Sequence, residues 1–365
     1  MAVEFIGMIG TRSASEIDGV ASSLIGGHVD REYVKRFAQA HEAAGFDRVL
    51  IGYGSSGPDG FGVASYVASV TDKLTFLIAH RPGFVAPTLA ARKAATLDQF
   101  TEGRIALHII TGGSDPEMQR DGDFVGHDDR YRRTDEYLDI VRKTWTEDTP
   151  FDYDGEFYQV RKAFSEVKPF QKPHVPIYFG GMSGPALPVG AKHADVFAMW
   201  GEPVAAVQAQ MDEVHVEAAK WGRKPKFSVS FRPILAANEE AAWEKARGFL
   251  DRVISLRGGV IPKYDPQAVG SQRLLGLAEE SEVHDDRLWT AIARAVGATG
   301  NTTALVGTPD QVCESLLRYY DAGVTTLLIR GFQPLDDATE YGRELIPMVR
   351  AEVAKREKAA NAPRR

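Results

Sequence analysis

The feature that most constrains the fold of this chain is a repeated alternation of short apolar segments with longer segments of helical periodicity. The apolar segments that have the length and composition of buried strands are residues 4–8, 48–51, 74–79, 104–110, 177–179, 196–199, 227–235 and 326–329. The helical segments between them include residues 31–44, 88–100, 129–146, 204–221, 239–256 and 309–322. Near-continuous apolarity suits parallel strands that are covered on both faces. Eight such strands alternating with helices predict an α/β fold. A (β/α)8 TIM barrel fits this pattern better than a doubly wound sheet does.

The length of 365 residues fits one large barrel with two insertions. We expect residues 1–350 to form a single domain and residues 351–365 to be a disordered C-terminal tail. Residues 147–173 contain a hairpin-like alternation around Asp154-Gly155. Residues 257–304 lie between the seventh and eighth strands, on the side where a barrel builds its active site. We expect this longer insertion to be a mobile lid, and a loosely tethered decorative insertion is the alternative.

The charge pattern and the cysteine content exclude several classes of protein. A net charge of −7 without a long basic run makes nucleic acid an unlikely partner. The N-terminus does not resemble a secretory signal, and no apolar stretch is long enough to span a bilayer. The chain has a single cysteine, Cys313, so an internal disulfide is excluded. We expect Cys313 to pack on the inner face of a helix. We therefore expect a soluble cytoplasmic protein without a membrane partner.

A glycine-rich turn follows the fifth predicted strand, in Tyr178-Phe-Gly-Gly-Met-Ser-Gly184. Backbone N–H groups and a hydroxyl at the start of a helix are typical of a phosphate site. We expect this turn to bind a phosphate-bearing cofactor against the flat side chain of Trp200, which ends the next strand. The pattern Gly52-Tyr-Gly-Ser-Ser-Gly57 also matches a dinucleotide fingerprint, but no helix follows it directly, so we favour a flexible barrel loop.

Polar residues end several of the predicted strands, where a barrel would gather them at one face. They are His80, Arg81, His108, Thr111, Trp200, Ser230, Arg232 and Arg330. Three arginines and a histidine at one mouth would attract a carboxylate, sulfonate or phosphate. In His127-Asp-Asp-Arg-Tyr131 an aspartate could cap the next helix, or Tyr131 could contact a cofactor phosphate. This segment lacks the ligand spacing of a metal site, so no metal is expected.

Several motifs together resemble those of the bacterial-luciferase-like flavin-dependent monooxygenases, and most of all the alkanesulfonate monooxygenase group. They are Arg81-Pro, the segment from Pro87 to Asp98, Thr101-Glu-Gly-Arg104, Thr111-Gly-Gly-Ser-Asp-Pro-Glu117, His127-Asp-Asp-Arg-Tyr131, Tyr178-Phe-Gly-Gly181, Trp200-Gly-Glu-Pro203, Val269-Gly-Ser-Gln-Arg273 and Thr303-Ala-Leu-Val-Gly307. The resemblance implies a barrel that takes reduced FMN (FMNH2) from a separate NAD(P)H-dependent flavin reductase. With O2, the enzyme would cleave the C–S bond of an organosulfonate to give sulfite and an aldehyde. A homodimer or homotetramer is also implied.

The resemblance assigns roles to individual residues. The cofactor-binding residues it implies are Thr111, His108, Tyr131, Gly180, Gly181, Met182 and Ser183. It also places Trp200 at the substrate cavity and residues 269–273 in the mobile insertion. From the strand ends we add Arg232, Arg330 and His80 to Trp200 as the predicted substrate and catalytic residues.

Several positions depart from the alkanesulfonate pattern, all of them in the substrate region. Ser56-Gly57 stands where the alkanesulfonate enzymes have a cysteine, and His108 stands where they commonly have an asparagine. Ser230-Phe-Arg232 corresponds to their Arg-x-His pair, and Phe332 corresponds to their tyrosine. Arg330 stands where a small residue is usual. These changes favour a bulkier or more polar sulfonate, such as a sulfosugar. The alternatives are a luciferase-like monooxygenase of a sulfone, alkane or amine, a deazaflavin-dependent oxidoreductase, or a non-catalytic flavin- or sulfonate-binding protein.

Overall fold

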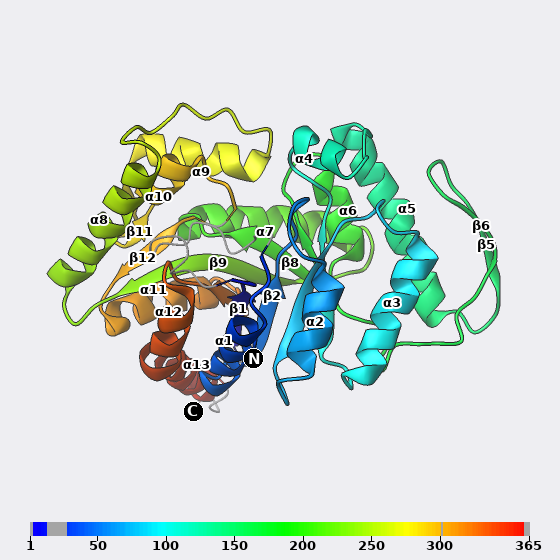
Figure 1. Cartoon of the computed structure of the whole chain (residues 1–365), viewed down its shortest axis with the longest axis horizontal. Helices are drawn as coiled ribbons and strands as arrows, with labels where there is room; N and C mark the ends of the chain where they lie inside the picture. The colour runs from blue at the N-terminus through cyan, green and yellow to red at the C-terminus, as the bar shows by residue number, and fades with distance from the viewer. Residues whose placement is uncertain (1–2, 13–27, 301, 361–365) are drawn as a thin grey trace.

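The computed structural model describes residues 3–12, 28–300 and 302–360, and its central element is a closed barrel of parallel strands (Figure 1). The barrel strands are β1 (Glu4–Ile9), β2 (Arg48–Ile51), β3 (Thr75–His80), β4 (Ile105–Ile110), β7 (Ile177–Gly180), β8 (Val196–Trp200), β9 (Lys226–Leu235) and β13 (Thr326–Ile329). Each pairs in parallel with the next, and β13 closes the ring by pairing with both β9 and β1. The predicted TIM barrel is confirmed.

Helices follow the strands. They are α1 (Arg31–Ala43), α2 (Gly60–Ala68), α3 (Pro87–Phe100), α4 (Asp115–Arg120), α5 (His127–Thr146), α6 (Ala186–His193), α7 (Val204–Ala219), α8 (Glu239–Leu256) and α11 (Pro309–Asp321). Helices α1, α3, α5, α7, α8 and α11 lie at the predicted positions, and α2, α4 and α6 add to them. Helix α11 starts with a capping box between Thr308 and Gln311, and Asn238 caps α8 through the Ala241 N–H. Such caps satisfy orphan amides and define where the helices begin.

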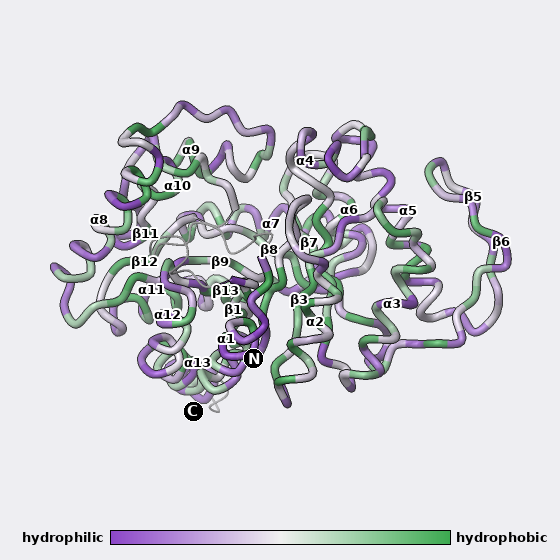
Figure 2. Tube along the Cα trace, viewed as in Figure 1, coloured by the Kyte–Doolittle hydropathy of each residue, from purple (hydrophilic) through white to green (hydrophobic). Residues whose placement is uncertain are grey.

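The core has two layers because side chains alternate across each strand. Outward-facing residues such as Phe76, Phe179 and Phe231 are fully buried against the helices. Inward-facing residues at one level of the barrel form a separate apolar plug of Ile6, Leu77, Ala106, Tyr178 and Val196. Hydrophobic colour accordingly marks much of the trace along the strands and stretches of the helices, while hydrophilic colour marks many outer loops (Figure 2).

The first insertion carries a two-stranded antiparallel hairpin of β5 (Phe151–Asp154) and β6 (Gln159–Ala163). It lies at the edge of the molecule beside α5, away from the barrel strands (Figure 1). The carboxylate of Glu136 on α5 accepts the backbone N–H groups of Glu156, Phe157 and Tyr158, which fixes the hairpin turn. The predicted β excursion is therefore observed.

The second insertion carries more secondary structure than the sequence indicated. It contains α9 (Val269–Glu280), β10 (Val283–His284), β11 (Leu288–Trp289) and α10 (Ala291–Val296). It leads into β12 (Ala304–Gly307), which pairs in parallel with the outer half of β9, from Arg232 to Leu235. Strand β9 thus belongs to the barrel over its first half and to a smaller sheet over its second.

The C-terminal tail corrects one prediction. Residues 351–360, which we expected to be disordered, belong to helix α13 (Ile346–Ala360). Val349 and Val353 are buried, and Tyr320 on α11 donates to Glu357, so this helix packs against the body. Residues 361–365 lie outside the described part of the chain. Cys313 on α11 is buried, and burial raises its pKa to about 11, in agreement with a packing role.

None of the helices within the described residues is long and apolar enough to cross a membrane.

Candidate active site

Small side chains face the barrel axis above the apolar plug, toward the carboxyl ends of the strands. Strand alternation and register place Ala79, Gly180, Ala198, Ser228 and Ser230 on this inner face. They come from β3, β7, β8 and β9, and the larger inward side chains beside them are His108 on β4 and Trp200 at the end of β8. The larger polar side chains at the mouth stand at the strand ends and in the loops that follow.

The turn between β7 and α6 presents hydrogen-bond donors that the described residues do not use. The backbone N–H groups of residues 181–184 donate no hydrogen bond within the described chain. The Ser183 hydroxyl is buried and has no partner there either. Gly181 has φ 146°, and a Cβ on it would lie 3.2 Å from the hydroxyl oxygen of Tyr131. Unused donors grouped at the start of a helix suit an anion, so we name residues 180–184 the anion cradle.

Tyr131 projects from α5 toward this cradle. Burial raises the pKa of Tyr131, and the nearby Ser183 hydroxyl and Arg130 oppose that shift. The Ser183 oxygen lies outside hydrogen-bonding geometry to Tyr131, which leaves both hydroxyls available to a ligand. The structure therefore places Tyr131 of α5 beside Gly180, Gly181, Met182 and Ser183.

His108 and Thr111, at the end of β4, complete this side of the mouth. The His108 ring faces the barrel axis, and its Cε1 would lie 3.2 Å from a Cβ placed on Gly180. Burial lowers the pKa of His108 to about 4, so the imidazole is neutral at pH 7. Its Nδ1 has no hydrogen-bond partner among the described residues. Thr111 is buried, with its hydroxyl 3.4 Å from that of Thr134.

Two buried arginines lie on adjacent strands across the mouth. Arg232 is fully buried on β9, with its Cζ 4.5 Å from the centre of the Phe332 ring. Arg330 directly follows β13, and its backbone N–H donates to Phe231 at 3.2 Å. Burial and the neighbouring Arg330 lower the pKa of Arg232, and burial lowers that of Arg330 to about 10. Arginine stays protonated under these conditions, so the pair places positive charge inside an acidic chain.

Trp200 ends β8, and helix α9 of the second insertion covers its ring. A Cβ on Gly270 would lie 2.9 Å from Trp200 Cζ3. Arg273 on the same helix donates to Glu202 Oε2 at 2.7 and 3.2 Å, and Glu202 is buried. Before the helix, Gln267 accepts the Asp115 N–H at 2.9 Å. The insertion therefore spans the mouth between the loops that follow β4 and β8.

Comparison with known proteins identifies the family. Residues 6–326 match the family model described as luciferase-like monooxygenase. The chain belongs to this family. The match covers most of the 365 residues, so the resemblance seen in the motifs is confirmed at the level of an oxidoreductase family. The alkanesulfonate group within it is not decided by this match.

Solved structures share the fold of this luciferase-like monooxygenase at low sequence identity. A riboflavin lyase (RcaE) is 18% identical with a TM-score of 0.77, over 97% of this chain and 92% of the other. DmoA from Hyphomicrobium sulfonivorans is 21% identical with a TM-score of 0.75, over 97% and 89%. EDTA monooxygenase (EmoA) from Chelativorans sp. BNC1 is 15% identical with a TM-score of 0.76, over 96% and 94%. At these identities the likeness concerns the fold alone.

His80 is a correction. We predicted it among the catalytic residues of the mouth, but alternation on β3 turns Leu77 inward and His80 outward. Its Nε2 lies 2.7 Å from the hydroxyl oxygen of Tyr137 on α5, and Phe61 on α2 meets its ring edge to face. Burial lowers the pKa of His80 to about 4. His80 therefore belongs to the layer between strands and helices, and we remove it from the candidate catalytic set of this monooxygenase.

The residue after His80 is the one that turns toward the mouth, and it leads to a group that sequence reasoning missed. Arg81 forms an ion pair with Glu117 at 2.8 Å and lies 4.4 Å from the Tyr53 ring. Tyr53 in turn donates to Asp121 at 2.6 Å and stacks on Phe84. Tyr53, Phe84 and Asp121 border an open pocket of about 770 Å³ at the rim of the barrel. Arg81 itself was among the polar residues predicted at the strand ends, but its partners Glu117, Tyr53 and Asp121 were not predicted.

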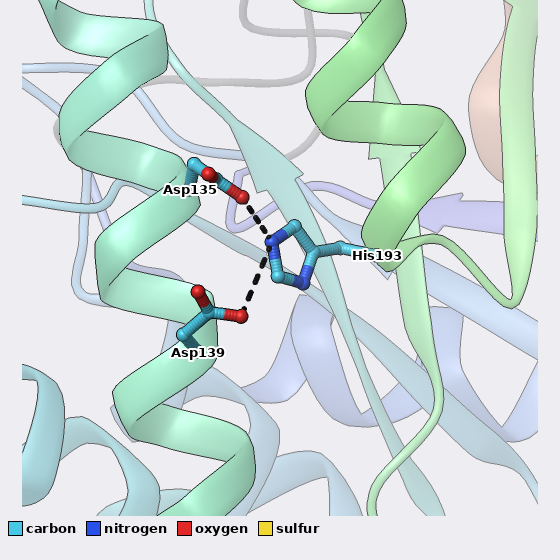
Figure 3. Close-up of side chains that lie close together, drawn as sticks. All are labelled: Asp135, Asp139 and His193. Atoms are coloured by element: carbon cyan, nitrogen blue, oxygen red, sulfur yellow. Dashed lines mark hydrogen bonds and ion pairs between the residues drawn. The ribbon is translucent and has the colours of Figure 1, made fainter. Parts of the chain in front are cut away.

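A cluster of Asp135, Asp139 and His193 between α5 and α6 has groups that could ligate a metal (Figure 3). His193 Nε2 lies 2.6 Å from Asp135 and 3.9 Å from Asp139. The ammonium of Lys192 lies 2.8 and 2.9 Å from the same two carboxylates. Because a cation of the chain already bridges them, the cluster is an ion-pair network that fixes α6, and with it the cradle, against α5.

Proposed function

We propose that this luciferase-like monooxygenase is the oxygenase of a two-component system. It takes FMNH2 from an NAD(P)H-dependent flavin reductase and uses O2 to cleave the C–S bond of an organosulfonate, which yields sulfite and an aldehyde. The observation that carries the flavin assignment is the anion cradle, with its unused N–H groups and the unpartnered, buried Ser183 hydroxyl. The phosphate of FMN is a dianion that such a group of donors fits. The structure of the similar riboflavin lyase contains a modified FMN.

The residues present define what the protein would contribute around FMN, which supplies the redox chemistry when bound. Tyr131, Ser183 and the amides of residues 181–184 would hold the phosphate. Neutral His108 can donate or accept a hydrogen bond without adding charge beside the flavin ring. Trp200 and the α9 helix packed on it would exclude water from the reacting groups.

Arg232 and Arg330 would bind the anionic end of the substrate. A sulfonate is ionised throughout the physiological pH range, and guanidinium groups match its oxygens through paired N–H donors. The small side chains of Ala79, Ala198 and Ser230 favour a substrate with a bulky or polar skeleton, such as a sulfosugar.

The test is sulfite release. The protein, FMNH2, O2 and a panel of linear, aromatic and sugar sulfonates should give sulfite and aldehyde in equal amounts for at least one member. Arg232→Ala should lower kcat/KM for that member by about ten- to a hundred-fold, through loss of a charge-assisted bond of roughly 1.5–3 kcal/mol. The affinity for FMN should not fall comparably.

Arg161→Ala is the matched control, since it removes the same charge from the exposed hairpin. An equal loss of flavin affinity in Arg232→Ala would assign this arginine to the flavin instead. No sulfite from any panel member would reject the sulfonate assignment.

A deazaflavin-dependent oxidoreductase is the second candidate. An F420-dependent secondary alcohol dehydrogenase shares the fold, with a TM-score of 0.67 over 96% of this chain and 99% of the other at 15% identity. Titration with FMNH2 and with reduced F420 separates the two functions. Strong preference for F420 would contradict an FMNH2-dependent oxygenase.

A further inference from the structure

The turn that follows β13 is built around a buried carboxylate. Residues 331–333 lead into α12 (Pro334–Glu340), and Asp337 on that helix is only 4% exposed. Its Oδ2 accepts the Gln333 N–H at 2.8 Å. A Cβ on Gly331 would overlap this carboxylate, so the turn closes tightly around Asp337. The conformation of three consecutive residues thus depends on one side chain.

This turn fixes the surroundings of both mouth arginines. Arg330 is the residue immediately before Gly331, so the turn sets its backbone direction. Phe332 is fully buried and supports the Arg232 guanidinium at 4.5 Å. The Phe332 ring is packed in turn against Phe249 on α8, 5.1 Å between ring centres. A shift of the turn would therefore move Arg330 and the platform of Arg232 together.

The same segment also holds the strand that carries Arg232. The hydroxyl of Tyr341 donates to the Pro233 carbonyl at 2.5 Å. Tyr341 begins a π-helical turn (Tyr341–Leu345), a rare geometry that often marks functional sites. From α8, Lys245 donates to the Leu235 carbonyl at 3.2 Å and lies 3.5 Å from Glu340 and 4.0 Å from Asp337. Helix α12 and the turn after it thus contact the ends of both arginine-bearing strands.

We propose that Asp337 is a positioning residue for anion recognition: by holding residues 331–333 it aligns Arg330 with the Arg232–Phe332 stack. Recognition of a tetrahedral anion by two guanidinium groups requires both groups to face the oxygens of that anion. The Asp337 carboxylate sets this alignment through the turn that it holds. The proposal rests on the proposed function in that the anion is the sulfonate of the substrate. Asp337 itself acts through hydrogen bonds to the turn and does not touch the substrate.

The experiment compares Asp337→Ala with Asp337→Asn, which keeps an oxygen acceptor for the Gln333 N–H. Glu340→Ala is the matched control, because it removes a carboxylate from the same helix that also lies near Lys245. Gly331→Ala disturbs the same turn, because its Cβ would overlap the Asp337 carboxylate. For each variant we would measure the Kd of inorganic sulfate by calorimetry on the protein saturated with oxidised FMN, which occupies the anion cradle, together with the Tm, the FMN Kd, and KM and kcat with a sulfonate that is turned over.

We expect Asp337→Ala and Gly331→Ala to raise the sulfate Kd and the sulfonate KM at least tenfold, with kcat and the FMN Kd within threefold of wild type. In Asp337→Asn the sulfate Kd and the sulfonate KM should lie within threefold of wild type. In Glu340→Ala both should lie within twofold of wild type. Unchanged sulfate affinity in Asp337→Ala overturns the proposal, as does an equal loss in Glu340→Ala. If neither Asp337→Ala nor Gly331→Ala folds, the turn serves the fold and the proposal is also overturned.

Sulfate binding needs no turnover, so this test and that of the proposed function can fail separately. A protein that releases no sulfite from any sulfonate, yet loses sulfate affinity in Asp337→Ala, would keep the positioning role and reject the substrate. A protein that releases sulfite from a sulfonate, yet binds sulfate normally in the Asp337→Ala variant, would keep the proposed function and reject the positioning role of Asp337.

Discussion

Residues 180 and 181 show how single positions shape the cradle. A Cβ on Gly180 would press on the His108 ring, and one on Gly181 would press on Tyr131 and Ala186. Tyr131 and Ala186 are buried and His108 stands on the barrel wall, so none of the three side chains can move away easily. Glycine is thus needed here for close approach of the backbone to a ligand, in addition to the positive φ at Gly181.

Ser183→Ala tests the cradle at the level of one atom. If the hydroxyl binds the FMN phosphate, its removal costs a hydrogen bond to a charged group, about 1.5–3 kcal/mol, so the FMN Kd should rise about ten- to a hundred-fold. The flavin-free protein should be at least as stable as wild type, because the buried hydroxyl has no partner among the described residues to lose. Flavin fluorescence quenching and thermal melts measure the two effects.

Ser315→Ala is the control for that variant, since the Ser315 hydroxyl bonds only to the Gln311 carbonyl within α11. It should leave the FMN Kd unchanged. A Ser183→Ala protein that binds FMN normally, or that melts at a clearly lower temperature, would contradict the cradle assignment.

Helix α9 is the element that covers the mouth, and Gly270 is its closest approach to Trp200. Gly270→Val should push the helix away from the indole, since a Cβ there already lies 2.9 Å from the ring. Overpacking of this kind costs typically about 1–3 kcal/mol. We expect kcat/KM for the substrate to fall at least tenfold and proteolysis within residues 257–304 to become faster, while the FMN Kd changes less than threefold.

Gly276→Val serves as the control on the same helix, because a Cβ at Gly276 meets nothing within 4 Å. Both substitutions carry the same helix-propensity change, so their difference isolates the contact with Trp200. Equal losses in the two variants would mean that α9 stability, and not its contact with Trp200, governs activity.

The elements differ in how far the sequence could predict them. Short apolar segments separated by segments of helical periodicity located all eight barrel strands, since these signals are local. Strand β9 was predicted over almost its whole length, yet its change of sheet at Arg232 depends on β12, some 70 residues later. His80 was misplaced for a related reason: β3 is buried on both faces, so polarity does not reveal which residues point inward.

The candidate site shows the same division between local and distant information. The anion cradle and the arginine pair follow from residues at strand ends, whose gathering the barrel dictates. The Asp337 turn, the covering of Trp200 by Gly270 and the Arg81–Glu117 ion pair depend on contacts between distant segments that no single-sequence pattern contains.

The whole barrel separates two functions along its axis. Its amino-terminal end is closed by the plug and by Glu4, which accepts hydrogen bonds from Arg48, Tyr178 and Thr326. Its carboxyl-terminal end holds the cradle, the arginine pair and Trp200. Several buried polar side chains between strands and helices lie outside both regions, and their cost falls on the stability of the molecule as a whole.

Acid should therefore destabilise this protein before its carboxylates are neutralised. His41 and His80 are buried in this layer and His108 lines the mouth, and desolvation lowers the pKa of each to about 4. In the unfolded chain the histidine pKa is about 6.5, so unfolding takes up protons below that pH. The stability that the neutral imidazoles retain is fully present above pH 6.5 and is lost as the pH falls toward 4. Between pH 7 and pH 5 the loss is a little under ~2 kcal/mol for each histidine.

Asp337 opposes this trend, because burial raises its pKa to about 6 and its protonation favours the folded state as the pH falls. That gain is about 1 kcal/mol between pH 7 and pH 5, which leaves a net loss of about 4 kcal/mol from these four groups. Urea unfolding at the two pH values measures the difference, and NMR of the imidazole protons should show three histidines still neutral at pH 5. Equal free energies of unfolding at pH 7 and pH 5 would contradict this account of the buried histidines. Titration of His41, His80 and His108 near pH 6.5 would also contradict it.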